Sequence, residues 1–181
     1  LQIPNIIGVL NLTPDSFSDG GKFNTSNKGL KHALEMFNSG ANVIDIGGES
    51  TRPGSKSIDS KIEWKRIEKT IKLICKKIPI SLDTRKSEVM KKGIKHGVKI
   101  INDVSGLDYD PETIYVLKKY NVPFVLQHSL GNPDVMQNNP KYKNVLLDIY
   151  DFFDEKIKSL RRAGINHNNI ILDRGIGFGK K

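Results

Sequence analysis

The chain has 181 residues, of which 37% are hydrophobic and 27% are charged. These proportions are typical of a packed globular protein and argue against a collagen-like, low-complexity or wholly disordered chain. The longest apolar runs, such as residues 6–10, fall far short of the ~20 residues that a membrane-spanning helix needs, and the amino terminus lacks the pattern of a secretory signal. We therefore expect one domain over residues 1–181, located in the cytoplasm and without a membrane partner.

The formal net charge is +9, from 29 Lys and Arg against 20 Asp and Glu. Such an excess can mark a nucleic-acid-binding protein, whose basic residues cluster to meet phosphates. Here the lysines alternate with apolar residues at helical spacing, as in residues 61–77. They are interpreted as the solvated faces of amphipathic helices, and no nucleic-acid partner is expected.

Short runs rich in β-branched residues alternate with longer helical patterns throughout the chain. Strands are predicted at residues 6–10, 42–46, 78–82, 99–101, 123–126 and 169–172. Helices are predicted between them, at residues 27–39, from Ser60 onward, and at residues 86–96, 111–120 and 143–163. Gly40 and Gly164 close the first and last of these helices and are expected to adopt the left-handed conformation past the last turn.

The helix after Ser60 shows one apolar stripe. Ser60 and Glu63 have the spacing of a capping box, in which each side chain bonds to the backbone N–H of the other residue. Isoleucines then recur at helical spacing, at positions 62, 67, 71, 74 and 78. Cys75 lies beside this stripe and is interpreted as a small buried hydrophobe. As the single cysteine, it also excludes an internal disulfide or a thiolate zinc cluster.

Alternating strands and helices imply a parallel sheet, because parallel neighbours need a crossover and the right-handed helical one is strongly favoured. An open doubly wound sheet and a (β/α)8 TIM barrel both fit this order. Only a barrel gathers the carboxyl ends of all its strands at one mouth. Polar residues follow every predicted strand, at Asn11, 47–52, Asp83, 102–103, 127–128 and 173–174. Some of these polar residues are explained by the solvent exposure of loops. Asp and Asn directly at strand ends nevertheless favour an α/β TIM barrel of which about six units are present.

Asp83, Asn102 and Asp173 offer two carboxylates and one amide at the predicted mouth. A carboxylate accepts two parallel hydrogen bonds, and an amide offers one donor and one acceptor, which suits a flat heterocycle of the guanine or pterin type. The same carboxylates could instead serve as general acid and base or bind a hard cation. The residue types alone leave these three roles open. For His128, which has no second His at zinc-ligand spacing, a packing or hydrogen-bonding role is favoured.

Three glycine-containing loops are candidates for ligand contact. Residues 11–21 form a long turn-rich loop with Phe17, which is typical of a lid. Residues 47–54 combine glycines, hydroxyls and Arg52, a composition that suits an anion. Residues 175–180 do not have the spacing of a Walker or dinucleotide loop, so their glycines are interpreted as a tight turn beneath a ligand.

Several motifs together resemble the dihydropteroate synthase family of folate biosynthesis, whose members are pterin-binding TIM barrels. Residues 11–21 read NLTPDSFSDGG and residues 44–54 read IDIGGESTRPG. Further along the chain come SLDT at 81–84, IND at 101–103, His128 with GNP at 131–133 and MQ at 136–137, and Asp173 with GIGFGK at 175–180. These motifs span nearly the whole chain in the order of the family.

The resemblance implies a transferase that condenses 6-hydroxymethyl-7,8-dihydropterin diphosphate with 4-aminobenzoate, giving 7,8-dihydropteroate and diphosphate. It implies Mg²⁺ as cofactor, held with the diphosphate by Asn11. By the same matching, Asp83, Asn102 and Asp173 grip the pterin, Thr51 contacts the diphosphate arm, Arg52 and Pro53 line the aminobenzoate side, and Phe17 moves over the site. The full-length protein is expected to be a homodimer.

The chain departs from the family pattern in three places. Arg174 stands where the family usually has Pro, and Ser129 stands where it often has Met. The sequence contains six strand candidates, whereas a complete barrel has eight. The resemblance therefore identifies an amino-terminal fragment, expected to be inactive by itself, without the later Ser-Arg-Lys loop or the terminal Arg and His that bind diphosphate.

Two other functions share some of these features. A pterin-binding methyltransferase, which transfers a methyl group from methyltetrahydrofolate to a corrinoid protein, has the same barrel and binds the pterin with the same carboxylates and amide. The loops at residues 13–21 and 50–54 argue against this function. A noncatalytic pterin-binding protein is the alternative from another class, since the carboxyl-terminal groups of the family are absent.

Overall fold

The computed structural model describes residues 5–13, 25–50, 55–128 and 144–176, without the side chains of Thr25 and Ser26. Its centre is one six-stranded sheet in which all neighbours are parallel and the spatial order follows the sequence. The strands are β1 (Ile7–Asn11), β2 (Val43–Gly47), β3 (Ile80–Asp83), β4 (Ile100–Asp103), β5 (Phe124–Gln127) and β6 (Ile170–Asp173). This order is that of six consecutive units of a (β/α)8 barrel.

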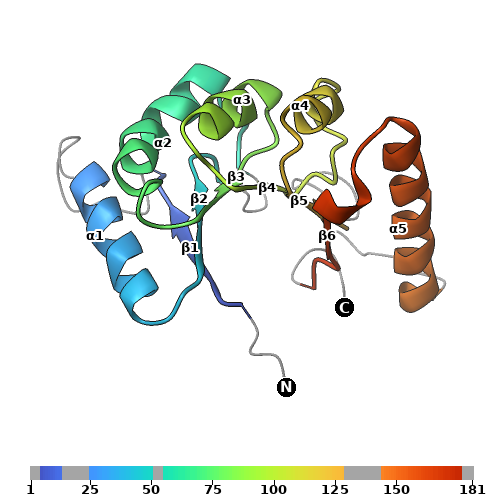
Figure 1. Ribbon diagram of the computed structural model, residues 1–181, viewed down its shortest axis with the longest axis horizontal. Helices are drawn as coiled ribbons and strands as arrows, with labels where there is room; N and C mark the ends of the chain where they lie inside the picture. The colour runs from blue at the N-terminus through green and yellow to red at the C-terminus, as the bar shows by residue number, and fades with distance from the viewer. Residues whose placement is uncertain (1–4, 14–24, 51–54, 129–143, 177–181) are drawn as a thin grey trace.

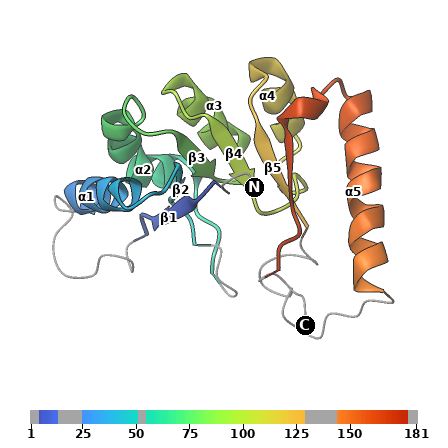
Figure 2. The same cartoon turned by 60° about the horizontal axis from the view of Figure 1, so that its bottom comes forward.

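The helices connect consecutive strands and lie on one side of the sheet, where Figures 1 and 2 show α1 to α4 as an arc outside the strands. They are α1 (Thr25–Asn38), α2 (Ser60–Ile74), α3 (Ser87–Lys95), α4 (Thr113–Tyr120) and α5 (Val145–Arg162), with a short 3₁₀ turn, η2 (His167–Asn169), before β6. No helix in the described ranges has the length and apolar character needed to cross a membrane.

All the predicted strands and helices are present, and the α/β class is confirmed. The strands differ from the prediction at their ends, because each runs one or two residues further than the apolar pattern. Their last residues are therefore polar or glycine: Asn11, Gly47, Asp83, Asp103, Gln127 and Asp173. The backbone hydrogen bonds of the sheet thus fix the very residues that sequence patterning assigns to loops.

The two faces of the sheet differ in chemistry because side chains alternate along each strand. On the face toward the helices, Ile44, Ile46, Ile80 and Leu82 are fully buried. They join Ile67, Ile71 and Ile74 of α2 and Val89 and Met90 of α3 in one apolar core. The residues between them, Asp45, Ser81 and Asp83, point to the opposite face, so the core holds the helices in place while that face presents polar groups.

The start of α2 differs from the capping box predicted for it. Asp59 is the N-cap, and its side chain accepts a hydrogen bond from the backbone N–H of Lys61 at 2.7 Å. The Ser60 hydroxyl instead donates to Glu88 of α3, and Glu63 is completely buried. Ile62 is 50% exposed, so the buried apolar stripe begins at Trp64 and continues through Ile67.

Other local predictions agree with the structure. Gly40 and Gly164 have φ values of 109° and 87°, in the left-handed region expected past the end of a helix. Cys75 is half-buried and packs against the core. His128 is buried, with its ring 4.8 Å from that of Phe152 on α5, in line with a packing role.

The outer strands β1 and β6 each pair with one neighbour in the described structure. Ile7 and Val9 on β1 are 51% and 59% exposed, and Ile171 and Leu172 on β6 are also exposed. The beginning of α5 adds Leu146 and Tyr150 to the exposed apolar residues. Figure 1 shows β1 and β6 at the two ends of the row of strands, with α5 beyond β6.

Candidate active site

Three of the predicted site residues lie in one row across the sheet. The parallel register pairs Asn11 with Gly47, Gly47 with Asp83, and Asp83 with Asn102. Each is at or next to the end of its strand, and each points to the face away from the helices, because its neighbours Leu10, Ile46 and Leu82 point into the core. The row therefore brings residues from four strands together on the open face.

Gly47 is the place where two of these side chains meet. A Cβ atom placed on Gly47 would lie 3.2 Å from Oδ1 of Asn11 and 3.2 Å from Oδ2 of Asp83. The two oxygens thus face the same small space above the glycine backbone, one from each side. A side chain at position 47 would fill that space, which explains why glycine suits the middle of the row.

The side chain of Asn102 is held in place by a hydrogen bond to a residue of β2. Its Nδ2 donates a hydrogen bond to Oδ2 of Asp45 at 3.0 Å. Asp45 itself is buried and lies two residues before Gly47 on the same strand. The Oδ1 atoms of Asn102 and Asp45 are buried with no hydrogen-bond partner in the described structure. The pair therefore presents acceptor atoms that a ligand with N–H groups could use.

The site concentrates negative charge in a poorly solvated place. Burial, then the nearby carboxylates of Asp45, Asp103, Glu63 and Glu49, raise the pKa of Asp83 well above its ordinary value. Burial also raises the pKa of Asp45, against the opposing effect of hydrogen bonds from Ser81 and Asn102. Burial raises the pKa of Asp103 to about 6, although Ser105 hydrogen-bonds to it. Ligand N–H groups or a cation would relieve this unfavourable charge.

Asp173 lies at the same end of the sheet but apart from the row. It pairs in register with Gln127, and its backbone oxygen accepts a hydrogen bond from the N–H of His128 at 2.9 Å. Its side chain is exposed, and Oδ1 accepts from the N–H of Gly175, which has a positive φ of 61°. Arg174, next in the chain, is exposed as well. The structure thus places Asp173 on the same rim, with one carboxylate oxygen engaged in its own turn.

The remaining predicted residues lie outside the described structure. These are Phe17 in the first loop, Thr51, Arg52 and Pro53 in the second, Ser129, and the end of the glycine-rich segment from residue 177. The flanks of the second loop are described on both sides. There the Ser55 hydroxyl donates to the backbone oxygen of Ser50 at 2.6 Å, so the two ends of this loop are close together.

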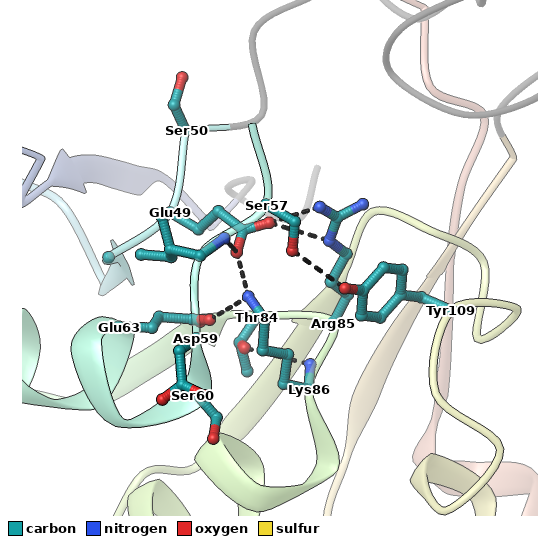
Figure 3. Close-up of polar contacts among 12 residues, drawn as sticks. Glu49, Ser50, Ser57, Asp59, Ser60, Glu63, Thr84, Arg85, Lys86 and Tyr109 are labelled. Atoms are coloured by element: carbon teal, nitrogen blue, oxygen red, sulfur yellow. Dashed lines mark hydrogen bonds and ion pairs between the residues drawn. The ribbon is translucent and has the colours of Figure 1, made fainter. Parts of the chain in front are cut away.

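Sequence reasoning missed a buried cluster of four charged residues beside the site, shown in Figure 3. Glu49 pairs with both Arg85 and Lys86, and Lys86 also pairs with Glu63 at 2.6 Å. The signal in the sequence was weak, because Glu63 matched a capping position and Arg85 and Lys86 resembled ordinary surface residues. A Glu between glycines and serine, directly after a buried strand, was the one feature that could have indicated it.

Comparison with known proteins relates this arrangement to a family. The profile of the family described as pterin binding enzyme matches residues 7–181. A dihydropteroate synthase from Clostridium beijerinckii is 45% identical over 177 residues, which cover 97% of this chain and 63% of that protein. The chain thus spans less than two thirds of the length of this curated relative.

Solved structures give the same result. The structure of a dihydropteroate synthase from Clostridium difficile in the presence of pteroic acid superposes with a TM-score of 0.88 at 41% identity, covering 98% of this chain and 66% of that one. A Xanthomonas albilineans dihydropteroate synthase with 4-aminobenzoic acid gives a TM-score of 0.89 at 37% identity, covering 98% and 63%. The family match, the sequence identity and the shared barrel order agree with the polar row on the open face. The chain therefore belongs to the family of pterin-binding enzymes.

Proposed function

We propose that the full polypeptide carrying this sequence is a dihydropteroate synthase of folate biosynthesis, a transferase. The observation that carries the proposal is the convergence of Asn11 and Asp83 over Gly47, with Asn102 next in the same row. The structures of relatives with pteroic acid and with 4-aminobenzoic acid support it. The substrates are then 6-hydroxymethyl-7,8-dihydropterin diphosphate and 4-aminobenzoate.

We assign the binding of the pterin ring to Asp83, Asn102 and Asp173. The ring edge of a pterin carries N–H donors beside a carbonyl acceptor, which complements carboxylates and an amide. Asn102 is oriented for this task because Asp45 occupies its Nδ2 and leaves Oδ1 without a partner in the described structure. Hydrogen bonds from the ring to Asp83 would favour its charged form and lower its raised pKa.

The residues present fit a Mg²⁺ ion bound together with the diphosphate. Mg²⁺ prefers oxygen ligands and commonly takes only one or two from the protein, the rest coming from water and substrate phosphates. Asn11 offers an amide oxygen beside the Asp83 carboxylate, with the space above Gly47 kept open. We therefore assign Asn11 as the protein ligand.

The proposed reaction forms one C–N bond and breaks one C–O bond. The amine nitrogen of 4-aminobenzoate attacks the methylene carbon that bears the diphosphate, which leaves with the bonding electron pair, and the amine then loses a proton. When bound, Mg²⁺ stabilises the negative charge that builds on the departing diphosphate. The row of β-strand residues orients the pterin, and no protein nucleophile is required.

We assign Thr51 to the diphosphate arm, Arg52 and Pro53 to the aminobenzoate side, and Phe17 to the cover of the site. These assignments rest on the sequence motifs alone. The same resemblance supports a homodimeric full-length protein, and we propose that residues 1–181 belong to one pterin-binding barrel domain of a cytoplasmic protein. A cationic Arg52 near the carboxylate of aminobenzoate and a hydroxyl near a phosphate are chemically apt.

The test is product formation by the purified full polypeptide. With both substrates and Mg²⁺, we expect dihydropteroate by chromatography and an equivalent amount of released diphosphate. Tight binding of the pterin diphosphate in a calorimeter, without product, would instead support the noncatalytic pterin-binding protein. Methyl transfer from methyltetrahydrofolate to a corrinoid protein, with no dihydropteroate, would support the methyltransferase.

A further inference from the structure

The buried charge cluster of Glu49, Arg85, Lys86 and Glu63 links the segments that follow β2 and β3 (Figure 3). It contains two carboxylates and two cations, so its charges balance. Glu49 and Lys86 are buried and Glu63 is fully buried. Surface ion pairs contribute little to stability, but breaking a buried pair leaves an uncompensated charge and is strongly unfavourable.

Glu49 is the centre of this cluster and belongs to the chain that leaves the site. It follows Gly47 and Gly48, and its Oε1 accepts from Nε of Arg85 at 2.9 Å and from Nη2 of the same guanidinium. Its Oε2 accepts from Lys86 and from the backbone N–H of Ile58 at 3.3 Å. One carboxylate therefore joins the two flanks of residues 51–54 to the chain after β3.

Lys86 completes the link on the other side. It lies three residues after Asp83, and its Nζ bridges Glu49 to Glu63 on α2. Its backbone N–H bonds to the hydroxyl of Thr84 at 3.2 Å, and the N–H of Thr84 bonds to the backbone oxygen of Asn102. The chain that carries Asp83 is thus fixed between β4 and the charge cluster.

Contacts around the cluster leave little room for adjustment. A Cβ on Gly48 would lie 2.9 Å from the backbone oxygen of Glu63, and the backbone oxygen of Gly48 accepts from Nη1 of Arg66 at 2.8 Å. The guanidinium of Arg85 lies 4.0 Å above the ring of Tyr109, whose hydroxyl is 3.0 Å from that of Ser57. The segments that follow β2, β3 and β4 are therefore tied together close to the strand ends that carry the row.

We propose that Lys86 is a positioning residue, which acts through Glu49 to hold the Gly47–Ser50 segment and Asp83 in the arrangement that binds the pterin diphosphate. The proposal rests on the proposed function for its catalytic consequence. Lys86 is buried and its Nζ is engaged by Glu49 and Glu63, so its effect is on geometry. Small displacements of groups that orient substrates lower rates steeply, by about 10²-fold for ~1 Å.

The test uses Lys86→Met in the full polypeptide, which keeps the length of the side chain and removes its charge. We expect KM for the pterin diphosphate to rise by about tenfold and kcat/KM to fall by about 10²-fold. A mere loss of folded enzyme would lower kcat without changing KM. We also expect amide hydrogen exchange in residues 47–50 and 55–59 to speed up by at least about tenfold, with residues 145–162 unchanged.

Two further variants separate positioning from stability. Glu63→Gln combined with Lys86→Met restores charge balance around Glu49 and Arg85, so it should recover much of the lost stability. KM should stay raised, and exchange in residues 47–50 and 55–59 should stay fast. Lys156→Met is the matched control, because Lys156 also bridges two elements, from α5 to Asp108 and the backbone of Gly106. It should leave KM within about twofold of the wild type.

Recovery of the wild-type KM in the double variant, or an unchanged KM in Lys86→Met, would overturn the proposal. If Lys86→Met does not fold, Glu49→Gln replaces it, with the same expected rise in KM and in exchange. A wild-type polypeptide that forms no dihydropteroate would refute the proposed function instead. Amide exchange would still decide the positioning claim, because it needs no substrate.

Discussion

The adjacent residues Gly47 and Gly48 allow the geometry of the site to be tested with a matched pair of substitutions. Neither has φ in the left-handed region, so alanine is compatible with the backbone at both positions. At Gly47 the new methyl group would meet the side-chain oxygens of Asn11 and Asp83 at 3.2 Å. At Gly48 it would meet the backbone oxygen of Glu63 and Cγ2 of Ile67 at 2.9 Å.

The two contacts differ in what has to move. The oxygens near Gly47 belong to side chains on the open face, and a shift of about 0.2 Å restores ordinary contact at 3.4 Å. We expect Gly47→Ala to change the free energy of unfolding by less than about 1 kcal/mol, because the reduced entropy of the unfolded chain offsets the crowding. In Gly48→Ala the new methyl group must push the backbone of α2 away from the end of β2. Overpacking of this kind destabilises a protein by about 1–3 kcal/mol.

We expect activity to follow the opposite order. Relative to the stability that each substitution loses, Gly47→Ala should lower activity more than Gly48→Ala does. The methyl group of Gly47→Ala fills the space between Asn11 and Asp83, where we place the Mg²⁺-bound diphosphate, so kcat/KM should fall by about 10–100-fold, equivalent to about 1.4–2.7 kcal/mol. Chemical denaturation and steady-state kinetics on the full polypeptide measure both quantities. Wild-type kcat/KM in a well-folded Gly47→Ala protein would refute the convergence of Asn11 and Asp83 on a shared ligand.

Three further predictions follow from the contacts and charges of the structure. Asp83→Ala should weaken binding of the pterin diphosphate by about 1–3 kcal/mol, because ring donors lose their acceptor in a buried site, and calorimetry showing unchanged affinity would contradict the assigned grip. Asp103→Asn should stabilise the protein relative to wild type as the pH rises. Since the pKa of Asp103 is raised from 3.8 to about 6, the stability that it contributes is fully present well below pH 3.8 and is lost as the pH rises through 6. Urea titrations at pH 4 and pH 7 should reveal a difference of about 2 kcal/mol. Finally, the 181-residue chain in isolation should self-associate through the exposed apolar residues of β1, β6 and α5, and Leu146→Lys, at a position 74% exposed, should reduce the associated fraction in sedimentation velocity. A monomeric wild-type chain at micromolar concentration would show that these faces do not drive association.

The order and type of the elements could be predicted because each depends on local patterning. Ile44 and Ile46 belong to an apolar run, which predicts a buried strand. The isoleucines of α2 at positions 67, 71 and 74 repeat at helical spacing, which predicts a buried helix face. The strand ends could not be placed as well, because Asn11, Asp83 and Asp103 join the sheet through backbone hydrogen bonds that carry no side-chain signal.

The places of some candidate site residues could be predicted for the same reason, whereas their roles stay predictions. Asn11, Asp83 and Asn102 were identified by their places after strands, and the register confirms that they share a row. Asp45 and Glu63 were missed as parts of the site and its support, because their significance comes from partners 57 and 23 residues away in sequence. The capping box predicted for Ser60 and Glu63 was wrong. The Glu63 carboxylate instead accepts a hydrogen bond from the buried, charged Lys86, which is stronger than one from a backbone N–H.

The charges around the row favour the chemistry proposed for it. Asp45, Asp83 and Asp103 are held in a poorly solvated place, so their negative charge is unfavourable in the empty site. As the C–O bond to diphosphate breaks, positive charge develops on the methylene carbon and spreads into the dihydropterin, and this charge is stabilised more strongly than the neutral ring of the substrate. Interactions that strengthen between the bound substrate and the transition state are those that raise kcat. Lys86 and Arg85 neutralise Glu49 and Glu63, so the uncompensated negative charge near the site is that of the three aspartates, of which Asp83 and Asp45 lie on the face where the proposed cation forms.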